Sequence, residues 1–219
     1  MTVQDHDIKQ IIGLVENGNM IKLIDILLQE NDEESILIPR RSPEERAKNY
    51  IIATNRKIQQ YIKDGGKGHL DLDNTPIISL PSNLTVGGNL DLSNSKITSL
   101  PSNLTVGGGL DLRNTPITSL PPDLKVGGGL YLYNTPIISL PSNLTVGGSL
   151  NLTNTPITSL PPNLKVGGYL DLTNTPITSL PPNLKVGGYL DLTNTPLSKS
   201  HTKEQIKQRV PGVKGNIYL

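Results

Sequence analysis

Residues 170–189 read LDLTNTPITSLPPNLKVGGY, and the same twenty-residue pattern recurs along most of the chain. Of the seven copies, only the last is cut short, after Leu197. The copies begin at Leu70, Leu90, Leu110, Leu130, Leu150, Leu170 and Leu190. Self-similarity at a fixed period of this length is typical of proteins whose repeated units stack on one another. We therefore expect a solenoid over residues 67–197.

Each apolar position of a copy has a place in such a coil. Leu170 and Leu172 alternate with polar residues, so both side chains point to one side of a short strand. Leu184 and Val186 have the same spacing, which predicts a second short strand in each coil. Thr175 stands where a buried hydroxyl can satisfy a backbone group as the chain leaves the first strand.

A pair of glycines, Gly187 and Gly188, separates the second strand from the next coil. We expect φ > 0 at this pair, because a sharp turn is needed there. Stacked coils align identical residues into columns, and parallel strands about 4.7–4.9 Å apart give a stack roughly 33 Å long. The pattern predicts a parallel β-solenoid with an all-aliphatic core.

The segment Leu170 to Ile177, L-x-L-x-x-T-x-I, resembles the L-x-L-x-x-N-x-L core of the leucine-rich repeat. The period and the Leu180–Pro181 pair are similar to the short class of secreted bacterial effectors, which usually has two Leu-Pro pairs per repeat. The Val-Gly-Gly segment is more like repeat proteins of viruses, phages and environmental bacteria. The resemblance covers about residues 69–197. It implies an α/β solenoid, a right-handed parallel β-solenoid of about seven coils, with a concave strand face that binds partners.

The ends of a solenoid need caps, because the terminal coils otherwise expose core and strand edges. Residues 7–30 predict a helical hairpin, and Ser42 followed by Pro43 predicts a helix over 43–64 that stops at Gly65. Residues 1–66 are thus an N-terminal helical cap or docking region, in which the hairpin is either part of the cap or a separate binding module. Residues 198–219 predict a C-terminal cap with a short helix, 202–209, and a closing strand, 215–219.

Composition argues against catalysis. The chain has no Cys, which excludes a disulfide framework, a thiolate metal site and the catalytic Cys of the effectors' ubiquitin-ligase domains. The three His residues are scattered, and residues 65–68 lack the spacing of a phosphate-binding loop. We expect no enzyme activity, no cofactor and no metal site.

The charge and hydropathy of the sequence limit the kinds of partner that we expect. The net charge is +1, so no general attraction to nucleic acid or to an anionic membrane is expected. The sequence has no secretory signal and no apolar run near the about 18 residues of a membrane span, and we expect a cytoplasmic or virion-associated protein. The Asn-Leu-Thr sequons at 83, 103 and 143 are expected to be by-products of the repeat.

Candidate binding residues lie at the outward positions of the first strand. Tyr131 and Tyr133 replace polar residues on one strand, and Arg113 stands beside Tyr133 one coil earlier. Tyrosines there either anchor a partner or simply cover the sheet, and the aspartates between the strand leucines serve solubility, a basic partner or a cation. The candidates are Arg113, Tyr131, Tyr133, Tyr169, Tyr189, Asp91, Asp111, Asp171 and Asp191.

These residues predict a non-catalytic recognition or scaffold protein that grips a protein partner with its strand face. One alternative is a viral or phage structural component that docks into a larger assembly through its N-terminal helices. The other, which rests on the family resemblance, is a secreted effector that binds a host protein.

Overall fold

The computed structural model describes residues 42–219, and the predicted hairpin 7–30 lies outside this range. The chain divides into two units between Asn55 and Arg56, within helix α3 (Pro43–Lys63). The helix begins as predicted: Ser42 Oγ accepts from the Glu45 N–H at 3.1 Å, and Glu45 Oε2 accepts from the Ser42 N–H at 2.9 Å. This reciprocal pair is a capping box, which satisfies two backbone donors at the helix start.

Helix α3 ends where the glycines were expected to stop it. The Gly66 N–H donates to the Tyr61 carbonyl and the Gly65 N–H to the Ile62 carbonyl, each at 3.0 Å. Both glycines have positive φ, 84° at Gly65 and 66° at Gly66. This pair of hydrogen bonds is the Schellman motif, in which a residue without a Cβ tolerates the left-handed conformation.

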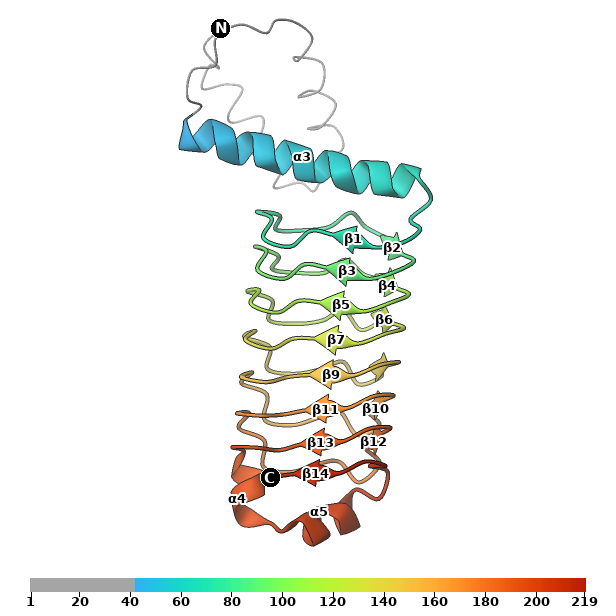
Figure 1. The fold of residues 1–219 in the computed structure, drawn as a ribbon, viewed down its shortest axis with the longest axis vertical. Coiled ribbons are helices and arrows are strands. Elements are labelled where there is room, and N and C mark those ends of the chain that lie inside the picture. The colour runs from blue at the N-terminus through green and yellow to red at the C-terminus, as the bar shows by residue number, and fades with distance from the viewer. Residues whose placement is uncertain (1–41) are drawn as a thin grey trace, which may run out of the picture. The chain divides into compact units, whose positions relative to one another are not determined.

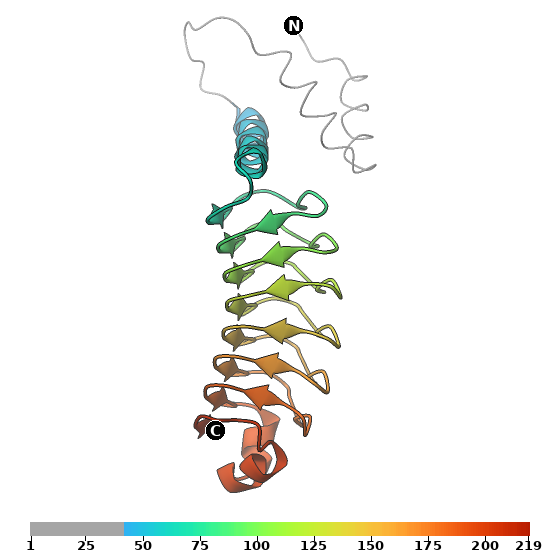
Figure 2. The same cartoon turned by 90° about the vertical axis from the view of Figure 1, so that its right-hand side faces the viewer.

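The repeats form a parallel β-solenoid with two sheets (Figures 1 and 2). The first strand of every copy joins an eight-stranded sheet: β1 (Leu70–Asp71), β3 (Leu90–Asp91), β5 (Leu110–Asp111), β7 (Leu130–Tyr131), β9 (Leu150–Asn151), β11 (Leu170–Asp171), β13 (Leu190–Asp191) and finally β14 (Ile217–Tyr218) from the C-terminal segment. The expected second strand forms the other, six-stranded sheet: β2 (Thr85–Val86), β4 (Thr105–Val106), β6 (Lys125–Val126), β8 (Thr145–Val146), β10 (Lys165–Val166) and β12 (Lys185–Val186).

Pairing between neighbouring coils is in register by one repeat, so that Leu70 lies beside Leu90 and Val166 beside Val186. Most leucines, isoleucines and valines of the repeat are buried in one continuous aliphatic core, whereas Leu140 and Leu180 are partly buried against it and Ile78 and Ile138 are exposed. The threonine prediction is confirmed: the hydroxyls of Thr75, Thr115, Thr135, Thr155, Thr175 and Thr195 donate to the carbonyl three residues earlier at 2.6–2.7 Å.

The expectation of φ > 0 at the paired glycines is wrong. Positive φ occurs instead at the asparagine before the buried threonine or serine, from 54° at Asn74 to 58° at Asn194, and also at Asn83 and Asn103. The glycines are required by close stacking: a Cβ added to Gly147 would lie 2.0 Å from the carbonyl oxygen of Gly127 in the coil before it. Backbone packs directly on backbone at this corner, and a side chain on these glycines would separate the coils.

Both ends of the described solenoid are covered. Ile58 of α3 is 2 % exposed and joins the aliphatic core, and the Tyr61 hydroxyl donates to the Gly66 carbonyl at 2.6 Å. At the other end lie helices α4 (Pro196–Ser200) and α5 (Lys203–Arg209), both with capping boxes. Helix α5 and strand β14 match the predicted cap, whereas α4 was not expected and runs across the predicted boundary at residue 197.

Candidate binding face

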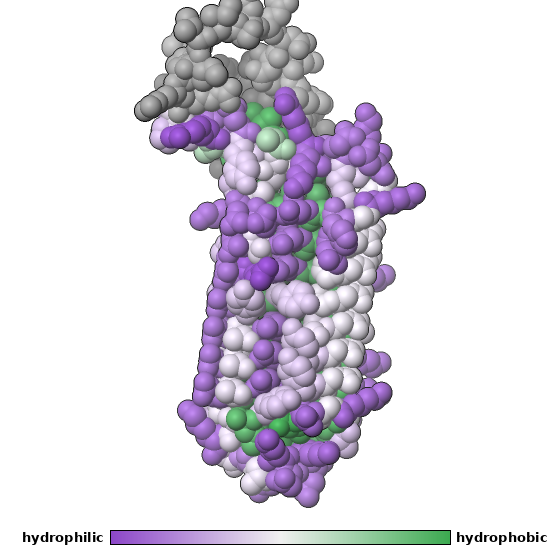
Figure 3. All heavy atoms as spheres, viewed as in Figure 1, coloured by the Kyte–Doolittle hydropathy of each residue, from purple (hydrophilic) through white to green (hydrophobic). Residues whose placement is uncertain are grey.

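The outward side of the eight-stranded sheet, here called the strand face, presents three columns of side chains. The middle column comes from the residue between the two strand leucines, and the outer columns from the residues before the first and after the second. The leucines themselves point into the core. Figure 3 shows this face as parallel hydrophilic and pale stripes that run along the stack, from one coil to the next.

The middle column is half-buried rather than fully solvated, except for Asp71, which is exposed. Each acid or amide in it accepts a hydrogen bond from the backbone N–H two residues later, as Asp171 Oδ1 does from Thr173 at 3.0 Å and Asn151 Oδ1 from Thr153 at 2.9 Å. The same contact occurs at Asp71, Asp91, Asp111 and Asp191. The aspartates therefore have a local role in ending the strand, which their position in the repeat did not predict.

The second carboxylate oxygen is the part of this column that remains for a partner. In Asp91, Asp171 and Asp191 this oxygen has no hydrogen bond or ion pair within residues 42–219. Within the same range, no three His, Cys, Asp or Glu side chains are grouped in a way that would hold a metal ion.

Arg113, Asp111 and Tyr133 form a cluster; the one-coil offset predicted Arg113 beside Tyr133, but not the part that Asp111 plays. Arg113 Nε lies 2.9 Å from Asp111 Oδ2, and an Arg113 terminal nitrogen donates to the Tyr133 hydroxyl at 3.3 Å. The guanidinium carbon is 5.8 Å from the centre of the Tyr133 ring, within cation–π range. The hydrogen bond to Tyr133 and the charge of Asp111 raise the pKa of Arg113. Burial raises the pKa of Asp111, more than Arg113 lowers it.

Tyr169 and Tyr189 stack at the C-terminal half of the face. Their ring centres are 4.8 Å apart and their planes differ by 4°. Tyr218 of β14 contacts Tyr189 edge-on, with 5.6 Å between centres and 81° between planes. Burial raises the pKa of Tyr169, and Tyr131, Tyr189 and Asp171 add to the effect. Each stacked ring covers one face of the other, and the hydroxyls and uncovered surfaces of the pair are what a partner can reach.

Tyr131 does not stand upright in the middle column. A Cβ added to Gly129 would lie 2.7 Å from the Tyr131 hydroxyl oxygen and 2.9 Å from its Cζ, so the ring leans over Gly129. The sequence predicted that Tyr131 belongs to the middle column, but not that its ring lies over Gly129. It also missed Tyr218, which alternation with buried Ile217 in the predicted closing strand indicates as an outward residue.

Helices within residues 42–219 lack the combination of length and apolar character that spanning a membrane requires. Comparison of the chain with models of known protein families and with curated protein sequences found no match.

Proposed function

We propose that this chain is a non-catalytic recognition or scaffold protein that binds a protein partner across its strand face. Solenoid repeat folds are typical of protein-binding scaffolds, because stacking creates one long, even surface. We also infer that the coils belong to the leucine-rich-repeat class of the short, twenty-residue type, on the strength of the Leu-x-Leu strands and the buried Thr and Ile that follow them.

The observation that carries the proposal is where the copies differ from one another. The first outer column contains His, Asn, Gly, Ser and Tyr, and the other outer column contains Asp, Ser, Arg, Tyr and Thr. By contrast, the outward position of the six-stranded sheet is always Thr or Lys. Variation among otherwise near-identical copies is concentrated on one face, and there it includes Tyr and Arg, the residues most enriched at the energetic centres of interfaces.

The geometry of the cluster and the stack supports the same surface. Arg113 is held by Asp111 and Tyr133, and Tyr169 is held by Tyr189, before any partner arrives. Side chains that are already ordered lose less conformational entropy on binding. The assembly and effector alternatives stay predictions, since the first depends on the N-terminal docking region 1–66, much of which lies outside the described residues, and the second on the family resemblance.

The test is a double substitution of Tyr131→Ala and Tyr133→Ala. We expect loss of the proteins that co-purify with the wild-type chain, because truncating central aromatic residues costs about 2 kcal/mol or more of binding energy. The matched control is Lys125→Ala with Thr145→Ala, two outward residues on adjacent strands of the other sheet. Equal recovery of every partner by both double variants would refute the strand face as the binding surface.

A further inference from the structure

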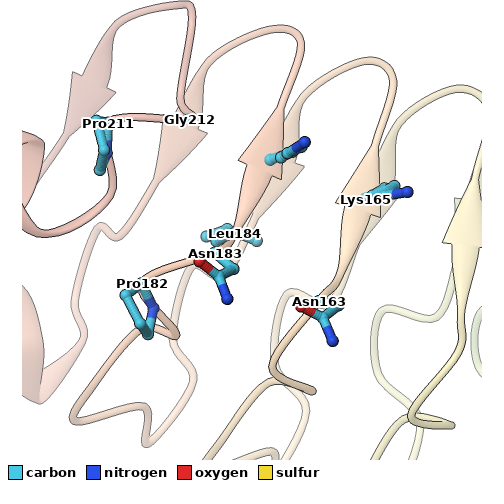
Figure 4. A pocket seen from close by; sticks show the side chains of 8 residues that line it. Asn163, Lys165, Pro182, Asn183, Leu184, Pro211 and Gly212 are labelled. Atoms are coloured by element: carbon cyan, nitrogen blue, oxygen red, sulfur yellow. The ribbon is translucent and has the colours of Figure 1, made fainter.

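A hollow of about 770 Å³ lies beside β10 and β12, the last two strands of the six-stranded sheet (Figure 4). Lys165 of β10 and Lys185 of β12 line this hollow, as do Asn163 and Asn183, which precede the same strands. The remaining lining residues are Pro182, Leu184, Pro211 and Gly212. The lining contains basic, amide and apolar groups and no carboxylate, unlike the strand face.

Beside β12, the last strand of this sheet, the chain carries a glycine at the position where the strands carry Thr or Lys. Val213 bridges to Val186, and the Val186 N–H donates to the Gly212 carbonyl at 3.1 Å, so residues 211–213 run beside β12. A Cβ on Gly212 would lie 2.3 Å from the Leu184 carbonyl oxygen, which explains the glycine. Lys185 is therefore bordered by bare backbone on one side.

The polar groups of the hollow are not used within the described chain. The side chains of Asn163, Asn183, Lys165 and Lys185 make no hydrogen bond or ion pair within residues 42–219. By contrast, the asparagines that precede the buried threonines are hydrogen-bonded to one another, as Asn174 is when it donates its side-chain amide to Asn154 at 2.7 Å. Lys165 and Lys185 are paired in register, and like charges at directly opposite positions of neighbouring strands repel. A bound anionic group would offset that repulsion.

We propose that this hollow binds an acidic segment of another polypeptide. Two ammonium groups on adjacent strands supply charge for carboxylates, and the two amides supply hydrogen bonds for carboxylates or peptide groups. Pro182 and Pro211 add apolar surface for the side chains between the acids. Single-stranded nucleic acid is the less suitable occupant, because it is held by many phosphate contacts and by aromatic stacking, and the lining has neither Arg nor an aromatic ring.

The test measures fluorescence anisotropy of a short labelled peptide of alternating glutamate and leucine, titrated with the full chain. We expect saturable binding that weakens as salt is raised. The double variant Lys165→Gln with Lys185→Gln is expected to weaken it about tenfold. Lys165→Arg with Lys185→Arg keeps the charge and is expected to bind as the wild type does.

Lys125→Gln is the matched control, since Lys125 occupies the same column of the same sheet but lies outside the hollow. It should leave the affinity unchanged. No measurable binding by the wild type, equal loss in the Lys125 variant, or tighter binding of a single-stranded oligonucleotide of the same charge would each overturn the proposal. The strand-face tyrosines play no part in this contact, so either binding site can fail without the other.

Discussion

Ser95 occupies the position that threonine holds in the other six copies. Its hydroxyl is the one buried side-chain polar atom without a hydrogen-bond partner in the described part of the chain. The threonines at this position all donate to the carbonyl three residues earlier. A β-branched side chain is stiff about χ1, whereas serine has no methyl group to hold its hydroxyl toward that acceptor.

We predict that Ser95→Thr stabilises the protein by about 0.5–1.5 kcal/mol, the usual net value of one buried hydrogen bond. The column has room for the methyl group, because Thr75 and Thr115 occupy it in the coils on either side. Urea denaturation followed by circular dichroism measures the change. Thr115→Ser is the mirror control and should destabilise by a similar amount, and a Ser95→Thr variant no more stable than the wild type would contradict the explanation.

For single residues, the sequence predicted those contacts that follow directly from the twenty-residue spacing. Arg113 and Tyr133 were expected side by side because one repeat separates them, and register fixes that neighbourhood. The lean of Tyr131 over Gly129 was not predictable, since it depends on the rotamer of Tyr131 and on the space that Gly129 leaves. The backbone hydrogen bonds of the aspartates were also missed, because charge on a strand face was interpreted only as a surface property.

The paired glycines between the second strand and the next coil are present for a different reason from the one that the sequence predicted. A glycine pair after a strand suggests a turn with positive φ, but in every coil it is the asparagine before the buried threonine or serine that has positive φ, joined by Asn83 and Asn103 in the first two coils. The closest contacts of the glycines come from the neighbouring coil, and a single coil considered alone does not reveal them. Stacking distance, not turn geometry, therefore determines which residues the corner accepts.

We predict that Gly147→Ala destabilises the fold by about 1–3 kcal/mol, because its Cβ would meet backbone atoms of Gly127 at 2.0 and 2.8 Å. The thermal unfolding midpoint measures the effect. Gly109→Ala is the matched control, since its nearest atom would be the Gly129 carbonyl oxygen at 3.3 Å and other copies carry Asn, Ser or Tyr there. If both variants melt at the same temperature, close stacking is not the reason for the glycines.

The caps were predictable where they carry local signals. Ser42 and Thr202 each begin a helix with a capping box, and both starts could be recognised in the sequence. Helix α4 was missed because Thr195 and Pro196 repeat the pair that leads into an extended segment in earlier copies. In the last copy the residues after Leu197 no longer follow the repeat, and Thr195 both donates to the Leu192 carbonyl and caps α4.

At the scale of the whole molecule, the solenoid is a stack in which each coil pairs only with its neighbours. The stability of such a stack is approximately a sum of coil terms and nearest-neighbour terms. A coil can therefore be removed without disturbing the two ends, provided that the cut keeps the copies in phase. Because the copies are nearly identical, removing one coil tests directly whether the coils are paired in register.

We predict that a chain lacking residues 150–169 folds, because the deletion joins Ser149 to Leu170 and restores an unbroken repeat. It removes β9 and β10, one strand from each sheet, and leaves Ile58 and helix α5 at their ends. The urea m-value should fall by about a tenth, in proportion to the surface that unfolding exposes. Deleting only residues 150–159 is the control: it removes β9 but keeps β10, so the two sheets lose their common phase and cooperative unfolding should be lost. If the in-phase deletion also fails to unfold cooperatively, the coils are not the independent units that their register implies.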